Sequence, residues 1–161
     1  MPEVSPAVPV YLPREIEIPD INVKAPVVQV GLTPDGAMEA PNGPDIIGWY
    51  NGSVAPGVRG NALVTAHVDW LDRQTGQSRT AVFWDLHKLE KGDTVIVHAE
   101  ENKSFTYTIR ETFTVRFDDP EALKYLEPKD DPILTLITCE GDFDANTRNY
   151  DKRRIVVADM Q

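Results

Sequence analysis

The sequence is poor in three features that define large classes of protein. It holds one cysteine in 161 residues, so no internal disulfide can form and folding does not need oxidation. It has no apolar run of about 18 residues, the length that a membrane-spanning helix requires. Lys and Arg number 16 against 26 Asp and Glu, a net charge of −10. This deficit of positive charge disfavours nucleic acid as a partner, because such binding depends on basic side chains that neutralise phosphates.

What the chain does have is a series of short apolar or alternating segments separated by turns. Its length suits one domain with a substantial core. Prolines at positions 2, 6, 9 and 13 predict a proline-rich N-terminal tether over residues 1–15, with the folded domain over 16–161. About eight short strands indicate an all-β protein, either a closed barrel or a sandwich. The strands are predicted at 21–23, 27–32, 46–50, 62–66, 94–99, 104–115, 133–137 and 154–158.

Loops and two short helices are predicted between these strands. Residues 82–89 suit one helical turn, and residues 121–126 suit a short helix that begins after an acidic cap and a proline and ends before Pro128. Residues 69–80 are polar and rich in turn formers, and residues 140–151 show no strand pattern. Both segments are therefore predicted to be exposed loops.

Cys139 stands where one of the predicted strands ends. The apolar run 133–137 indicates a buried strand that leads into the thiol, and a polar, glycine-containing segment follows it. A free cysteine often serves as a small core side chain. However, functional groups concentrate where a rigid element meets a loop. The sequence pattern alone leaves both interpretations open.

Thiol chemistry needs a partner that accepts the proton or lowers the pKa of the thiol, because a free thiol is mostly protonated near neutral pH. His67 ends a predicted strand before a loop, as Cys139 does. His87 lies in the predicted helical turn and His98 inside the predicted strand 94–99, so both are interpreted as structural residues. Arg153 and Arg154 both stand at the start of the strand after Cys139, and either could stabilise negative charge on a substrate oxygen, because the periodicity of the strand does not choose between them.

These segments resemble the signature of the sortases, the cysteine transpeptidases of Gram-positive cell surfaces. Residues 135–139 read TLITC, residues 150–158 read YDKRRIVVA, and Arg153 follows the cysteine by 14 positions. Residues 62–69 read ALVTAHVD, similar to the histidine segment of the family. The motif CEGDFD at 139–144 is more similar to sortases of classes E and F than to class A. The resemblance covers roughly residues 16–160.

The resemblance implies an eight-stranded β-barrel and a defined reaction. It implies Cys139 as nucleophile, His67 as acid and base, and Arg153 as support for the oxyanion or the substrate backbone. It also implies that the loop over 116–131 recognises the Leu-Pro part of a Leu-Pro-x-Thr-Gly sorting signal. The implied substrate contacts, beside the signal's scissile bond or its Leu-Pro part, are Thr138, Ala122, Tyr125 and Leu126.

The partners that the resemblance implies are secreted proteins with such a sorting signal and an amine from a cell-wall precursor or a pilin lysine. It implies action at the extracellular face of the plasma membrane, with an N-terminal anchor that lies outside this chain. No cofactor is implied, and no metal is expected because the three histidines lack ligand spacing and the acidic clusters suit solvated loops.

Two other functions fit the same residues. A cysteine peptidase would use the same thiol and imidazole but resolve the thioacyl intermediate with water. A non-catalytic surface β-barrel that binds a partner would keep Cys139 in its core. Accessibility of the native thiol to alkylation separates the second alternative from both enzymes.

Overall fold

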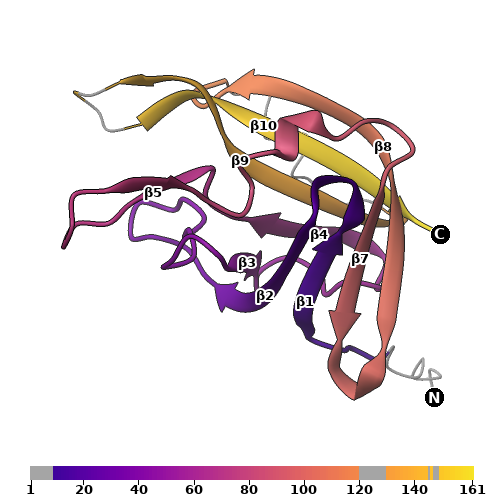
Figure 1. Ribbon diagram of the computed structural model, residues 1–161. Helices are drawn as coiled ribbons and strands as arrows, with labels where there is room; N and C mark the ends of the chain where they lie inside the picture. The colour runs from indigo at the N-terminus through magenta and orange to yellow at the C-terminus, as the bar shows by residue number, and fades with distance from the viewer. Residues whose placement is uncertain (1–8, 120–129, 145, 147–148) are drawn as a thin grey trace, which may run out of the picture.

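The computed structural model describes residues 9–119, 130–144, 146 and 149–161. In this part of the chain, eight strands close a barrel in the order β1-β2-β3-β4-β9-β10-β8-β7, with β7 paired back to β1 (Figure 1). The predicted all-β fold with an eight-stranded closed barrel is confirmed. The barrel strands are β1 Pro13–Ile18, β2 Val23–Val30, β3 Ile47–Tyr50, β4 Gly60–Thr65, β7 Thr94–Ala99, β8 Ser104–Arg116, β9 Pro132–Asp144 and β10 Asn149–Met160.

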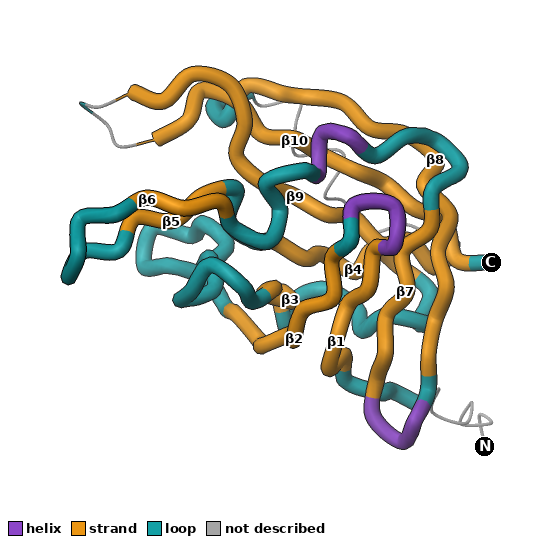
Figure 2. Tube along the Cα trace, in the orientation of Figure 1, coloured by secondary structure: helices purple, strands orange, loops and turns teal. Residues whose placement is uncertain are grey.

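Short elements lie outside the barrel. The strands β5 (Asp69–Leu71) and β6 (Ser78–Thr80) pair with each other as a hairpin. Figure 2 shows this hairpin projecting from the barrel in the same direction as the joined ends of β9 and β10. The 3-10 helices are η1 Pro19–Ile21, η2 Leu86–Lys88 and η3 Glu100–Asn102. Among the described residues, no helix is long and apolar enough to cross a membrane.

The main core fills the inside of the barrel with alternate residues of its strands. Tyr107 of β8 is 1% exposed there, and its hydroxyl accepts a hydrogen bond of 2.9 Å from the N–H of Gly57. Gly57 has a φ of +87°, and a Cβ at this position would lie 2.4 Å from the ring of Phe105, so glycine is required. Strands β4, β9 and β10 contribute Ala62, Val64, Leu134, Leu136, Val156 and Ala158 to this core.

A second, smaller apolar cluster lies on the opposite face of the same wall. Ile133, Ile155 and Val157 are buried there, with Phe113 and Val115 packed against them. Because β9 and β10 bury side chains on both faces, their apolar residues stand in consecutive positions rather than in alternation. The wall that carries the candidate site is therefore a rigid, two-sided element.

The first strands differ from their predicted bounds. One strand, β2, runs from Val23 to Val30 through Pro26, where two separate strands are predicted. Pro26 opposes Glu15 of β1, and pairing with β3 begins one residue later, at Val27. The proline, which lacks an N–H, thus sits where β2 changes neighbours, a position that tolerates it.

The tether predicted over residues 1–15 overlaps the barrel at its end. Pro13 opens β1 and pairs with Ala99 of β7, so residues 13–15 are part of the barrel wall. Proline is tolerated at the first residue of a strand, which is where Pro13 stands.

Both segments predicted as loops contain paired backbone. Residues 69–71 and 78–80 form the β5–β6 hairpin, and β9 and β10 extend over 140–144 and 149–151. In these segments the pairing follows from antiparallel hydrogen bonds between neighbouring strands and not from an apolar face, so the periodicity of the sequence gives no signal. The predicted helix at 121–126 lies outside the described residues.

Candidate functional site

Cys139 and Arg153 face each other across two neighbouring strands. The antiparallel register pairs Arg153 of β10 directly with Cys139 of β9. Side chains of directly opposed residues project from the same face of a sheet at close range. The thiol is half-buried, so it is neither a core side chain nor a freely exposed one.

The same register separates the two neighbouring arginines. Arg154 opposes Thr138, on the other face of the strand pair, and its Nη1 donates to the Thr112 hydroxyl at 3.2 Å. The guanidinium of Arg153 is held differently. Its Nη1 donates to the backbone carbonyl oxygens of Tyr150 and Lys152, both at 3.0 Å.

His67 reaches the same edge from the other side of β9. The strand β4 runs parallel to β9, with Thr65 opposite Ile137. His67 and Cys139 each follow two residues later, so the register continues toward a His67–Cys139 pairing just beyond the end of β4. The described elements thus bring imidazole, thiol and guanidinium to one edge of three adjacent strands, β4, β9 and β10.

The imidazole of His67 has a defined orientation. Its Nε2 lies 2.8 Å from the carbonyl oxygen of Pro41, and its ring meets Trp70 edge-on with centroids 5.1 Å apart. A carbonyl oxygen can only accept a hydrogen bond, so Nε2 carries the hydrogen. In the neutral ring, Nδ1 is then the nitrogen with a free lone pair for proton exchange.

Two threonine hydroxyls tie the histidine segment to the cysteine strand. Thr65 Oγ1 donates to the carbonyl oxygen of Ile137 at 3.1 Å, and Thr138 Oγ1 donates to that of Ala66 at 2.8 Å. Thr138 is 4% exposed, with its hydroxyl engaged beside His67. In this structure Thr138 therefore holds the backbone before the histidine; its contact with substrate stays a prediction.

The electrostatics of the thiol are mixed. Burial raises the pKa of Cys139, the positive charge of Arg153 lowers it, and the carboxylate of Asp69 raises it further. The net rise in the pKa favours the neutral thiol over the thiolate. Arg153 is the group that favours the thiolate.

Sequence reasoning missed Asp69 and Tyr150. The Tyr150 hydroxyl donates to Asp69 Oδ2 at 2.5 Å, between residues 81 positions apart. Burial first, and then Asp69, raises the pKa of the Tyr150 phenol above its ordinary value. The only feature of the sequence that could have pointed to them is their position, since Asp69 follows His67 by two residues and Tyr150 precedes Arg153 by three.

The remaining sequence candidates lie elsewhere. His87 is on η2, where its Nδ1 lies 3.2 Å from the carbonyl oxygen of Trp84. His98 Nε2 contacts Glu17 Oε1 at 3.3 Å, where β7 pairs with β1 on the opposite side of the barrel from β9. Ala122, Tyr125 and Leu126 lie outside the described residues. Within the described ranges, no three His, Cys, Asp or Glu side chains are grouped closely enough to hold a metal ion.

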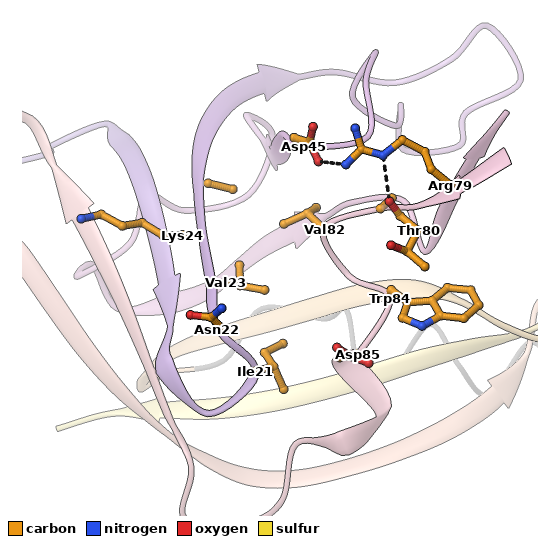
Figure 3. Close-up of a pocket in the computed structure, with 12 residues that line it drawn as sticks. Ile21, Asn22, Val23, Lys24, Asp45, Arg79, Thr80, Val82, Trp84 and Asp85 are labelled. Carbon is orange, nitrogen blue, oxygen red and sulfur yellow. Dashed lines mark hydrogen bonds and ion pairs between the residues drawn. The ribbon is translucent and has the colours of Figure 1, made fainter. Parts of the chain in front are cut away.

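A cavity of about 500 Å³ is lined by residues of 21–25 and 79–85 together with Asp45, and it shares no lining residue with the site (Figure 3). Arg79 and Asp45 form an ion pair of 2.7 Å along one side of it. The segment that lines this cavity also supports His67, because Phe83 N donates to the His67 carbonyl oxygen at 3.1 Å.

Comparison with known proteins gives consistent matches. A family model described as the sortase domain matches residues 16–161. Sortase D of Bacillus subtilis (strain 168) is 31% identical over 124 residues, which cover 77% of this chain and 52% of that protein. The chain thus spans about half the length of this curated relative.

Solved structures share the fold. The crystal structure of sortase C1 from Streptococcus agalactiae matches with a TM-score of 0.66 and 25% identity, over 92% of this chain and 66% of that one. A lid mutant of sortase A from Corynebacterium diphtheriae matches with a TM-score of 0.69 and 22% identity, over 93% of this chain and 70% of that one.

Proposed function

The chain belongs to the sortase family, and from this premise we propose that it is a cysteine transpeptidase. It cleaves a C-terminal Leu-Pro-x-Thr-Gly-like sorting signal between Thr and Gly and joins the acyl part to an amine. The observation that carries this proposal is the register of the wall: Cys139 opposes Arg153 on one side and is in line with His67 on the other.

The first half of the reaction makes a thioacyl enzyme. Nδ1 of His67 takes the proton of the neutral Cys139 thiol as the sulfur attacks the carbonyl carbon of the substrate threonine. The carbonyl oxygen becomes an oxyanion, to which the Arg153 guanidinium donates. The C–N bond then breaks, and His67 returns the proton to the leaving glycine amine.

The second half consumes an amine. The incoming amine attacks the thioester carbonyl, His67 removes one of its protons, and the new amide forms as the sulfur leaves and is protonated again.

The acceptor is an amine of a cell-wall precursor or a pilin lysine, and the donors are secreted proteins that bear the sorting signal. The reaction takes place at the extracellular face of the plasma membrane. Assignment to class E or F stays a prediction, because the relatives named above carry the class letters A, C and D.

Incubation with a Leu-Pro-x-Thr-Gly peptide, with and without an added amine, tests the proposal by mass spectrometry. We expect the amide adduct when amine is present, and no product from Cys139→Ala. Accumulation of the free acid alone, at any amine concentration, would identify a peptidase that uses water. Absence of any product, together with a native thiol that resists alkylation, would favour the non-catalytic barrel.

A further inference from the structure

The hydrogen bond between Tyr150 and Asp69 joins two parts of the molecule that are otherwise paired separately. Asp69 opens β5, whose ladder partner in the described chain is β6 alone. Tyr150 belongs to β10, in the barrel wall. The bond of 2.5 Å therefore connects the projecting β5–β6 hairpin to the wall that carries the candidate site (Figure 1).

Each partner is also attached to one of the proposed reactive groups. Asp69 lies two residues beyond His67 along one short segment of backbone. The carbonyl oxygen of Tyr150 accepts a hydrogen bond of 3.0 Å from Nη1 of Arg153. A register shift between Tyr150 and Lys152 interrupts the ladder there, and such irregularities beside active sites re-aim side chains.

We propose that the Asp69–Tyr150 pair is a positioning device, which holds the His67 segment and the Arg153 guanidinium in one fixed geometry around Cys139. The inference rests on the proposed transpeptidase function for its rate consequences. Tyr150 and Asp69 are positioning residues here, because they act through His67 and Arg153 and not on the substrate.

The charge of Asp69 supports this role. A carboxylate near a nucleophilic thiol raises the pKa of the thiol and so opposes formation of the thiolate. The hydrogen bond that Asp69 accepts from Tyr150 reduces this effect, because it disperses part of the negative charge of the carboxylate. Among the described residues, Arg153 of β10 and Asp69 of β5 act on the thiol electrostatically, and the thiol and Asp69 both act on Tyr150 of β10. His67 follows the end of β4, in line with Cys139.

Two single variants separate the bond from the charge. Tyr150→Phe removes the donor and keeps the ring, and Asp69→Asn keeps an acceptor oxygen and removes the charge. In Tyr150→Phe the undispersed carboxylate acts on the thiol, so the pH midpoint of Cys139 alkylation by iodoacetamide moves upward. In Asp69→Asn the midpoint moves downward. We expect kcat of Tyr150→Phe to fall roughly ten- to a hundredfold, the loss that follows from one hydrogen bond to a charged group, with KM little changed.

Tyr107→Phe is the matched control, because it also removes one phenol hydroxyl from a hydrogen bond but lies in the barrel core. It should lower Tm while leaving the alkylation midpoint and kcat near the wild-type values. The inference is overturned if the two midpoints fail to move in opposite directions, or if Tyr150→Phe behaves like Tyr107→Phe. Alkylation needs no substrate, so it tests the pair even if the wild-type protein forms no product from peptide and amine, the result that would count against the proposed function instead.

Discussion

At the scale of single residues, strand register decides which arginine can serve the thiol. Arg153 opposes Cys139, whereas Arg154 opposes Thr138 and bonds to Thr112. We expect Arg153→Ala to lower kcat/KM by about 10²–10³, the usual loss for one oxyanion donor, and Arg153→Lys to restore only part of it. Arg154→Ala should keep most of the activity. Steady-state assays on one peptide compare the three variants, and a larger loss at Arg154 would contradict the assignment.

The histidines give a second residue-scale prediction. His67→Ala should lower kcat/KM by about 10²–10⁴, because it removes the group proposed to exchange protons with the thiol and the leaving amine. His98→Ala is the control, since His98 pairs with Glu17 between β7 and β1. Equal losses in the two variants, measured with the same peptide and amine, would show that the acid–base residue is wrongly chosen.

Sequence reasoning named the candidate residues that a motif marks, whose roles stay predictions, and missed the pair that only folding brings together. Cys139, His67 and Arg153 stand at predicted strand ends, and the structure brings their segments onto adjacent strands. Asp69 and Tyr150 meet across 81 residues, from segments without strand periodicity. No local pattern encodes such a pairing, because it depends on the direction in which the β5–β6 hairpin leaves the barrel.

At the scale of elements, the bond from Thr138 to the Ala66 carbonyl holds the end of β4 to β9. Thr138→Val keeps the β-branched shape but leaves that buried carbonyl without its hydroxyl donor. We expect a loss of about 1–3 kcal/mol in the free energy of unfolding, and a fall in kcat/KM as the His67 segment loosens. Urea unfolding and peptide assays measure the two effects. Thr114→Val, at an exposed position of β8, should change neither by a comparable amount.

The elements themselves were predictable where side chains carry a pattern. The apolar segments that became β3, β4, β7, β8 and the inner halves of β9 and β10 were all expected as strands. The hairpin at 69–80 and the extension of β9 and β10 past Cys139 were not expected, because backbone pairing between adjacent strands forms them without an apolar face. Pro26 misled in the opposite direction, since it suggested a break inside a continuous strand.

At the scale of the whole molecule, Tyr107 makes barrel stability depend on alkaline pH. Burial raises the pKa of Tyr107 from 10.0 to about 12, against the opposing hydrogen bond from Gly57. The neutral phenol is thus favoured in the folded state, and this contribution is complete below pH 10 and lost as the pH rises through 12. The two pKa values differ by an amount worth roughly 2–3 kcal/mol.

Urea unfolding at pH 8 and pH 11 measures this dependence. The free energy of unfolding should fall between the two pH values in the wild-type protein. In Tyr107→Phe the fall should be smaller, although the variant starts from a lower stability because the Gly57 N–H loses its acceptor. An equal fall in both proteins would place the alkaline sensitivity in other groups.

The position of β10 in the barrel governs when the site can exist. It follows β8 and β9 along the chain, yet it stands between them in the wall. The parallel partners β4 and β9 join residues 72 positions apart at Thr65 and Ile137, so loop-closure entropy delays their pairing and the contact order of the barrel is high. During synthesis, Cys139 is made before Arg153. Until β10 forms, β8 and β9 each have one edge without its pairing strand. Cys139, the proposed nucleophile, and Arg153 therefore become neighbours only when β10 pairs with β9, so a chain that has not yet formed β10 carries the thiol without its paired guanidinium.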